Sequence, residues 1–531
     1  MLSLEPTDDR AHPAFRDVAA CHKWLGQLQL TNLNLAQSSL RSELDELNRL
    51  PLSGKARLNI LEALRETVAQ VQNDFAKKLV GKALPLADEE LDLLLSLADL
   101  WQAMLHGYLR CIESSGMGAL LYQRCLFYAR CRLTAFTAAG YAPDPRSWQQ
   151  LHALYAAIEA SPLRREVVRD PYFHDNLPVT CQTLYLATLL MHHARLLGLP
   201  RSQLHLAEHW LLHWPDTLAL VASSNLSKGD APPLVVDLHG QQGLRSLAYA
   251  QRSDSLRFLP LVPLSKQIRV KTILLKQGQT PRQLDLGDAL AAKDCIALLE
   301  TLHACWCEAS TDTLADVPRP TQPVHLCAGL EKSYGQIAQK PFKPVKDVTK
   351  AVRDAQLQIA TFGRVLDETG RHKLQELGFV PEEWQVESNG LIEARLLRLH
   401  ASDERLAPRQ IVIVFAPESD GYKAGMVRQI EVTQGGLLYL VVHYLPGQPQ
   451  AVIAQAAATG GEQWQSSSAP ALLLPALENL RIPASLVLPR GWFAPGRVME
   501  LITPARSKRK IALGISVESG SDYERVSFSL L

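Results

Sequence analysis

Apolar side chains recur at steps of three and four along residues 1–215, and this period is typical of amphipathic α-helices. The clearest stripe runs from Gly54 to Val80, and its members are Leu61, Leu64, Val68, Val71, Phe75 and Leu79. Asp88 is placed to cap a second helix, whose buried face begins at Leu94. The pattern predicts about seven or eight helices with short connections, so residues 1–215 are expected to form an α-helical bundle or hairpin stack.

The helical period weakens after residue 215. Thr217–Ala222 and Leu234–Leu238 are short, β-branched runs that predict strands, and Ser265–Lys276 and Asp288–Cys307 predict further helices. Residues 216–310 are therefore expected to be a mixed α/β segment. Residues 311–380 begin with a proline-rich stretch, Thr311–Pro323, and are expected to form a linker followed by helices.

Short strand-like runs dominate residues 381–531. Gly435–Gly436 is a hairpin signal between two of them. The spacing predicts a small antiparallel β-barrel, and the chain as a whole is expected to be a multidomain α+β protein. The expected strands are Gln410–Phe415, Gly425–Val432, Leu437–Leu445, Leu472–Leu474, Ser485–Leu488, Val498–Ile502, Ile511–Val517 and Arg525–Leu530.

Charge and cysteine content narrow the functional classes. The 55 basic and 54 acidic residues give a net charge of +1, which argues against a chain built to coat nucleic acid, so no DNA or RNA partner is expected. No apolar run reaches the ~20 residues of a membrane span, and the N-terminus lacks the order of a signal peptide. Nine irregularly spaced cysteines indicate a reducing compartment, so we expect a cytoplasmic protein without disulfides.

Motifs of catalysis and metal binding are missing from the sequence. It contains no phosphate-binding loop, no GxGxxG and no GxSxG nucleophile elbow, so we expect no enzyme. Two histidine and cysteine groups are poorly spaced for one ion, because residues eight apart on a helix are ~12 Å apart and residues two apart diverge. The first group is His205, His209 and His213, and the second is His303, Cys305, Cys307, His325 and Cys327. We expect neither group to bind a metal. The basic turn Arg506–Lys510 is expected to be solvated.

Two short motifs stand in the β region. Ser388 and Gly390 lie in the stretch WQVESNGLIEARLL, which runs from Trp384 to Leu397, and Arg405 and Arg409 form an Arg-x-x-x-Arg pair. These features resemble the PilZ domain, a small bacterial barrel in which Arg-x-x-x-Arg precedes an Asp/Asn-x-Ser-x-x-Gly motif. The order is reversed here, Val386 stands where an acidic or amide residue belongs, and Gly390 is one position early. The upstream arginines Arg353, Arg364 and Arg371 have a different spacing.

The resemblance implies cyclic di-GMP as a ligand and no cofactor. Guanidinium groups of Arg405, Arg409 and Arg428 would bind phosphates or guanine edges, with Ser388, Asn389 and Gly390 at the pocket edge. A glycine allows close approach of the backbone to a ligand. The alternatives are a solvated strand face for the arginines and an ordinary Asn-Gly turn for the serine stretch.

Two helical segments, Leu47–Glu62 and Trp148–Glu159, resemble uncharacterised bacterial proteins that join a long helical region to a PilZ-like tail. The resemblance implies a non-enzymatic cytoplasmic adaptor that responds to cyclic di-GMP, acts on motility, pili or surface attachment, and binds a protein through its helical domain. The alternative is a helical interaction scaffold whose barrel binds no nucleotide. Arginines that converge on one rim of the barrel would favour nucleotide binding, and dispersed arginines would favour the scaffold.

Overall fold

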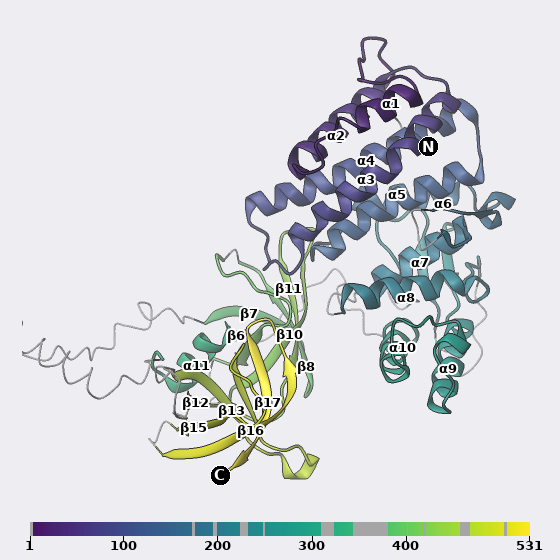
Figure 1. Ribbon diagram of the computed structural model, residues 1–531. Coiled ribbons are helices and arrows are strands. Elements are labelled where there is room, and N and C mark those ends of the chain that lie inside the picture. Colours follow the sequence, from purple (N-terminus) through teal and green to yellow (C-terminus); the bar gives the residue numbers. More distant parts are fainter. Residues whose placement is uncertain are drawn as a thin grey trace, which may run out of the picture. The chain divides into compact units, whose positions relative to one another are not determined.

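The computed structural model describes residues 4–171, 176–194, 199–223, 232–247, 250–308, 323–342, 381–400, 402–417, 421–456, 468–503 and 507–531 (Figure 1). The chain forms two compact units. Met1–Lys82 and Leu86–Asp316 make the helical unit, and Ala83–Pro85 and Val317–Leu531 make the barrel unit. The helices expected after Lys346, together with Arg353, Arg364 and Arg371, lie outside the described residues.

Eight of the α-helices described in the helical unit precede the mixed segment, and local capping explains where several begin. The Ser53 hydroxyl accepts from the backbone of Ala56, and the Asp144 carboxylate accepts from that of Arg146. Asp88 is the first residue of its helix rather than the cap; the Glu90 side chain accepts from Ala87 N at 3.0 Å. The helices are α1 (Val18–Leu25), α2 (Leu33–Arg49), α3 (Gly54–Ala76), α4 (Asp88–Ser115), α5 (Ala119–Ala138), α6 (Pro145–Ala156), α7 (Cys181–His193) and α8 (Arg201–His213).

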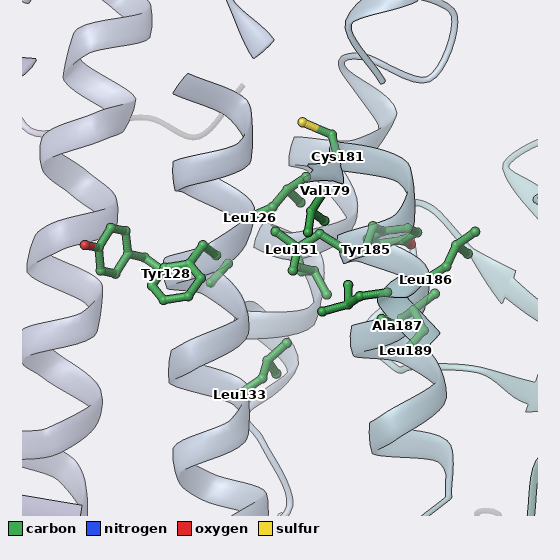
Figure 2. Packing of buried hydrophobic residues seen from close by; sticks show 14 of the residues in the cluster. Leu126, Tyr128, Leu133, Leu151, Val179, Cys181, Tyr185, Leu186, Ala187 and Leu189 are labelled. Carbon is green, nitrogen blue, oxygen red and sulfur yellow. The ribbon is translucent and has the colours of Figure 1, made fainter. Parts of the chain in front are cut away.

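The mixed segment continues the core of the helical unit. One hydrophobic cluster runs from Phe15 to Cys307, and Figure 2 shows its part between α5, α6 and α7. The indole N–H of Trp306 donates to the carbonyl of Leu190 on α7 at 3.0 Å. The segment holds a sheet of order β4-β3-β5 and two helices: β3 (Leu234–Asp237), β4 (Arg245–Ser246), β5 (Leu256–Leu259), α9 (Val262–Lys276) and α10 (Ala292–Cys307). Two short strands, β1 (Val167–Val168) and β2 (Val179–Thr180), pair separately.

One expected strand of this segment, Thr217–Ala222, is not a regular strand. Thr217 ends a 3-10 turn, and Val221 forms only an isolated bridge with Phe258. The proline at position 215 fixes its own φ and favours the tight turn over an extended backbone. None of the described helices in either unit is long and apolar enough to cross a membrane.

The barrel unit contains two closed antiparallel barrels of six strands each. The first has the order β10-β11-β8-β7-β6-β9, and the second has the order β12-β13-β14-β17-β16-β15. The first is built from β6 (Pro323–Ala328), β7 (Glu382–Asn389), β8 (Glu393–Arg398), β9 (Ile411–Phe415), β10 (Lys423–Val432) and β11 (Leu438–Tyr444). The second is built from β12 (Gln450–Ala456), β13 (Ser468–Leu474), β14 (Ser485–Pro489), β15 (Val498–Ile502), β16 (Lys508–Ser519) and β17 (Tyr523–Leu530).

The two barrels share a hydrophobic cluster. Ile411 and Ile413 of the first barrel belong to it together with Leu472 and Val487 of the second. The helix α11 (Leu330–Ala338) contacts β6 and β9 as well as β12 and β13. The fold class expected from the sequence is confirmed, with a helical N-terminal region, a mixed middle and an antiparallel C-terminal β region. The difference is that the strands close into two barrels, the first of which begins at Pro323.

The junction of the barrels leaves no room at Gly520. A Cβ added there would overlap the ring of Tyr523 and the carbonyl of Arg409. Next to it, the Asp522 carboxylate accepts from Ile411 N at 3.0 Å, and Ser521 N donates to Arg409 O at 2.9 Å. The β16–β17 turn therefore binds the backbone that leads into β9 of the first barrel.

Candidate functional site

The Ser388–Gly390 motif lies at the tip of the β7–β8 hairpin. A bulge between Val386 and Ser388 shifts the register, so Ser388 pairs with Arg395 of β8. The backbone N–H of Gly390 donates to the carbonyl of Glu393 at 2.8 Å and closes the turn. Ser388, Asn389 and Gly390 are all exposed. The motif therefore presents polar groups to solvent at one end of the first barrel.

Arg428 reaches the same hairpin from β10. It stands in a second bulge, where the register shifts between Val427 and Gln429. Its Nη1 lies 3.0 Å from one carboxylate oxygen of Glu393, and Nε of Arg395 lies 3.4 Å from the other. The three side chains are 55%, 28% and 24% exposed for Arg428, Glu393 and Arg395. Arg395 and Arg428 therefore both contact the carboxylate of Glu393, at an end of the barrel that an anion could approach from solvent.

Tyr444 fixes the position of Asn389 in the hairpin. Its hydroxyl donates to Asn389 Oδ1 at 3.1 Å, and the ammonium of Lys423 lies 4.6 Å from its ring centroid. Burial raises the pKa of Tyr444 to about 12, so the phenol remains protonated and keeps donating across the physiological range. Lys423 adds a third basic group to this end of the barrel.

The other two predicted arginines use their guanidinium groups elsewhere. Arg405 donates from Nε and Nη2 to the carbonyl of Ala83, at 3.2 and 2.8 Å. Arg409 donates from Nη2 to the carbonyl of Ser519 in the second barrel. Its backbone is closer to the cluster, since Arg409 N donates to Val427 O at 2.8 Å. The structure thus brings Arg428 to the Ser388–Gly390 hairpin and uses the Arg405 and Arg409 side chains to bind backbone carbonyls.

Three members of the cluster were not predicted: Glu393, Arg395 and Lys423. Glu393 and Arg395 alternate with the buried Ala394 and Leu396, and this alternation in the sequence is the signal that could have placed them on the outer face of a strand. Their approach to Arg428 depends on β11, which pairs with both β8 and β10.

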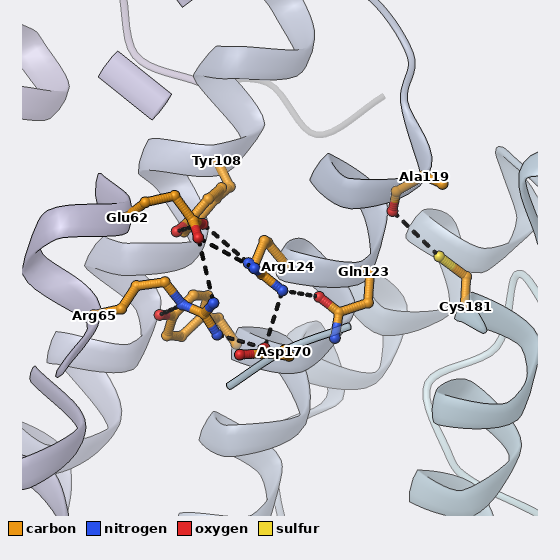
Figure 3. A network of polar contacts seen from close by, with 9 residues as sticks. Glu62, Arg65, Tyr108, Ala119, Gln123, Arg124, Asp170 and Cys181 are labelled. Carbon is orange, nitrogen blue, oxygen red and sulfur yellow. Dashed lines mark hydrogen bonds and ion pairs between the residues drawn. The ribbon is translucent and has the colours of Figure 1, made fainter. Parts of the chain in front are cut away.

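The helical unit buries a separate group of charges (Figure 3). Asp170 accepts from Arg65 Nη2 at 2.5 Å and from Arg124 Nη1 at 3.0 Å, and all three side chains are less than 5% exposed. Glu62 accepts from Arg124 and from the hydroxyl of Tyr108. Burial acts to raise the pKa of Glu62, but the hydrogen bond and charge of Arg124 outweigh it and lower that pKa. These charges satisfy each other, so they hold α3, α4 and α5 to the segment after β1 and do not form a ligand site.

The two histidine and cysteine groups and the basic turn are the other candidate sites from the sequence. His205, His209 and His213 lie on α8, and His303, Cys305 and Cys307 lie on α10. Among the described residues, no group of three His, Cys, Asp or Glu side chains is arranged to hold a metal. Burial raises the pKa of Cys307 and Cys327 to about 12, which disfavours the thiolate that binds metals. Lys508, Arg509 and Lys510 of the basic turn are exposed on β16, and Arg506 lies outside the described residues.

Comparisons with known proteins match both ends of the chain. The family described as "Cyclic-di-GMP receptor FimW, N-terminal domain" matches residues 19–224, and the "FimW C-terminal beta-barrel domain" matches residues 452–531. A curated relative, "Cyclic-di-GMP receptor FimW" of Pseudomonas aeruginosa, is 23% identical over 577 residues, which cover 98% of this chain and 92% of the relative.

A solved structure titled "MrkH, A novel c-di-GMP dependence transcription regulatory factor" is 8% identical, with 42% of this chain and 91% of that chain covered. Its TM-score of 0.12 is too low to support a shared arrangement. The two domain models, in contrast, match in chain order and together span more than half of the 531 residues. They agree with the helical region and β-barrel expected from the PilZ resemblance, so the chain carries the two domains by which the FimW family is described.

Proposed function

We propose that this protein is a non-enzymatic receptor for cyclic di-GMP and that the ligand binds at the β7–β8 hairpin of the first barrel. The family description and the name of the curated relative both state a cyclic-di-GMP receptor. The observation that carries the choice of site is the pairing of Arg395 and Arg428 on the carboxylate of Glu393, beside Ser388–Gly390. Two arginines on one rim of a barrel favour a nucleotide over a scaffold without a ligand.

The chemistry of the cluster suits a cyclic dinucleotide. Its phosphodiesters are anions that guanidinium groups bind through paired hydrogen bonds, and the Hoogsteen edge of guanine offers two acceptors to the same groups. In the structure the carboxylate of Glu393 contacts both guanidinium groups. A phosphate would take the place of Glu393, while the exposed Ser388 hydroxyl and Asn389 amide would contact the remaining polar edge.

The proposed receptor acts as a cytoplasmic adaptor. The ligand would change how the protein engages a protein partner through the helical unit, without catalysis and without DNA or RNA. Such a change requires that the ligand bind one arrangement more tightly than the other. The expected action on motility, pili or surface attachment stays a prediction.

Calorimetric titration of the full chain with cyclic di-GMP tests the proposal. Removing one charge-assisted contact should weaken binding about ten-fold or more in Arg428→Ala and in Arg395→Ala. Arg509→Ala, which removes an exposed arginine from β16, is the matched control and should bind as the wild type does.

The remaining outcomes separate the site from the function. If the Arg405→Ala/Arg409→Ala double variant loses binding and Arg428→Ala keeps it, the receptor proposal stands and the hairpin site is wrong. If the wild type does not bind at high ligand concentration, the receptor proposal fails. The helical scaffold whose barrel binds no nucleotide then becomes the better interpretation, as the dispersed side chains of Arg405 and Arg409 would suggest.

A further inference from the structure

All charged residues of the helix α9 are basic. Its sequence, VPLSKQIRVKTILLK, contains four basic residues and no acidic one. Its inner face packs Leu264, Ile268 and Leu275 into the core of the helical unit. Tertiary packing therefore accounts for one face of the helix and leaves the opposite face to be explained.

That opposite face combines aliphatic and basic side chains. Val262, Val270 and Ile273 are 47%, 43% and 54% exposed, and Lys266 and Arg269 are exposed between them. Val262, Lys266, Val270 and Ile273 follow steps of four, four and three, so they share one side of the helix. We call these four residues and Arg269 the α9 outer face.

Three of the four basic residues on α9, Lys266, Arg269 and Lys276, have weak ion pairs or none with the described acidic residues. Lys276 pairs with Glu300 at 2.7 Å, but both side chains are more than half exposed, so the pair is weak. Arg269 donates from Nε to Nε2 of His303 at 3.1 Å. Lys266 forms no ion pair within the described part of the chain. Among the described residues, neither Lys266 nor Arg269 on the α9 outer face is paired with a carboxylate.

We propose that the α9 outer face docks reversibly on an anionic lipid surface. Aliphatic side chains would enter the headgroup boundary, and long basic side chains would reach the lipid phosphates around them. The chain as a whole has a net charge of only +1, so attraction to a membrane must come from a local patch of this kind. This surface is independent of the proposed nucleotide site.

Lipid fits this face better than an acidic protein helix does. Centres of protein interfaces are depleted in lysine and enriched in aromatic residues and methionine. The α9 outer face has Lys266 at its middle, only valine and isoleucine as apolar groups, and no aromatic residue. A lysine at a lipid surface keeps its ammonium among headgroups while its stem covers apolar surface.

Vesicle co-sedimentation of the full-length protein tests the proposal. The wild type should bind phosphatidylcholine vesicles that contain phosphatidylglycerol, should bind less as salt is added, and should not bind pure phosphatidylcholine. Val270→Asp/Ile273→Asp and Lys266→Glu should each weaken binding by roughly ten-fold. Leu95→Asp on α4 is the matched control, because Leu95 is also 44% exposed, and it should leave binding unchanged.

Three results would overturn the proposal. The first is a wild type that ignores both kinds of vesicle, which would leave the face to an acidic protein partner. The second is equal binding to charged and uncharged vesicles, which would remove the role of the basic residues. The third is full binding by Val270→Asp/Ile273→Asp when circular dichroism shows that it has the helix content of the wild type, which would place the lipid contact elsewhere.

Discussion

Replacing Asp170 by alanine tests the energetic role of the buried charges in the helical unit. Asp170 is 1% exposed, and its carboxylate binds the guanidinium groups of Arg65 and Arg124, which are 1% and 4% exposed. The substitution leaves each arginine without one anionic partner inside the unit. Removal of one partner from a buried ion pair costs about 3–5 kcal/mol, because an uncompensated charge remains buried.

The expected loss is near the lower end of that range. Glu62 still binds Arg124 through two hydrogen bonds of 3.0 and 3.1 Å and lies 3.5 Å from Arg65. We therefore expect the free energy of unfolding of the helical unit to fall by about 3 kcal/mol. Urea denaturation followed by the far-ultraviolet helical signal measures this difference.

A surface ion pair provides the control. Asp74 pairs with Lys77 at 2.6 Å, but the two side chains are 39% and 66% exposed, so Asp74→Ala should cost less than about 1 kcal/mol. If Asp170→Ala were as mild as Asp74→Ala, burial would not make these charges interdependent. The description of Glu62, Arg65, Arg124 and Asp170 as a structural network would then be refuted.

Further predictions concern pH, close packing and the arginine pair. Burial lowers the pKa of His152 from 6.5 to about 4, so the unfolded chain binds the proton first as pH falls. The contribution of the neutral His152 to stability is complete above pH 6.5 and falls by up to about 1.4 kcal/mol per pH unit toward pH 4. Urea denaturation across this pH range measures the change in the free energy of unfolding. If His152→Gln showed the same dependence of stability on pH as the wild type, this prediction would be contradicted. Gly520→Ala should destabilise the barrel unit by about 2 kcal/mol through overlap, whereas Gly435→Ala, whose Cβ has its nearest neighbour at 3.9 Å, should change thermal denaturation little. The Arg405→Ala/Arg409→Ala variant should keep cyclic di-GMP binding but lose about 1–3 kcal/mol of barrel stability, because the two arginines it lacks bind backbone carbonyls. Unchanged stability would refute the structural role of these arginines.

Local patterns in the sequence were enough to predict individual elements. The stripe that starts at Gly54 corresponds to α3, and the expected strand Gln410–Phe415 corresponds to β9 at Ile411–Phe415. Strand partners were not predictable, because an alternating run is compatible with any neighbour. His325 pairs with Phe415 across a long stretch of chain, and pairings of this kind decide that twelve strands close into two barrels.

The candidate site shows the same division. Residue types alone indicated that Asn389 and Gly390 could form a turn, and the chain does turn there. The approach of Arg428 to Glu393 required the register of three strands, which the sequence does not reveal. The Arg-x-x-x-Arg motif of Arg405 and Arg409 suggested a pair of ligand-binding residues. In the structure both side chains bind carbonyls, whose positions depend on the folded chain.

The hydrophobic cluster between the barrels has a consequence for how this protein can change over time. Leu472 and Val487 lie in the stretch matched by the C-terminal domain model, yet they share a core with Ile411 and Ile413, which lie outside it. A volume change at any of these positions must be accommodated by the others, because cores tolerate few voids and little overpacking. The two barrels should therefore be inherited and exchanged as a pair, and a chimaera cut between β11 and β12 would need compensating substitutions on both sides of the cut.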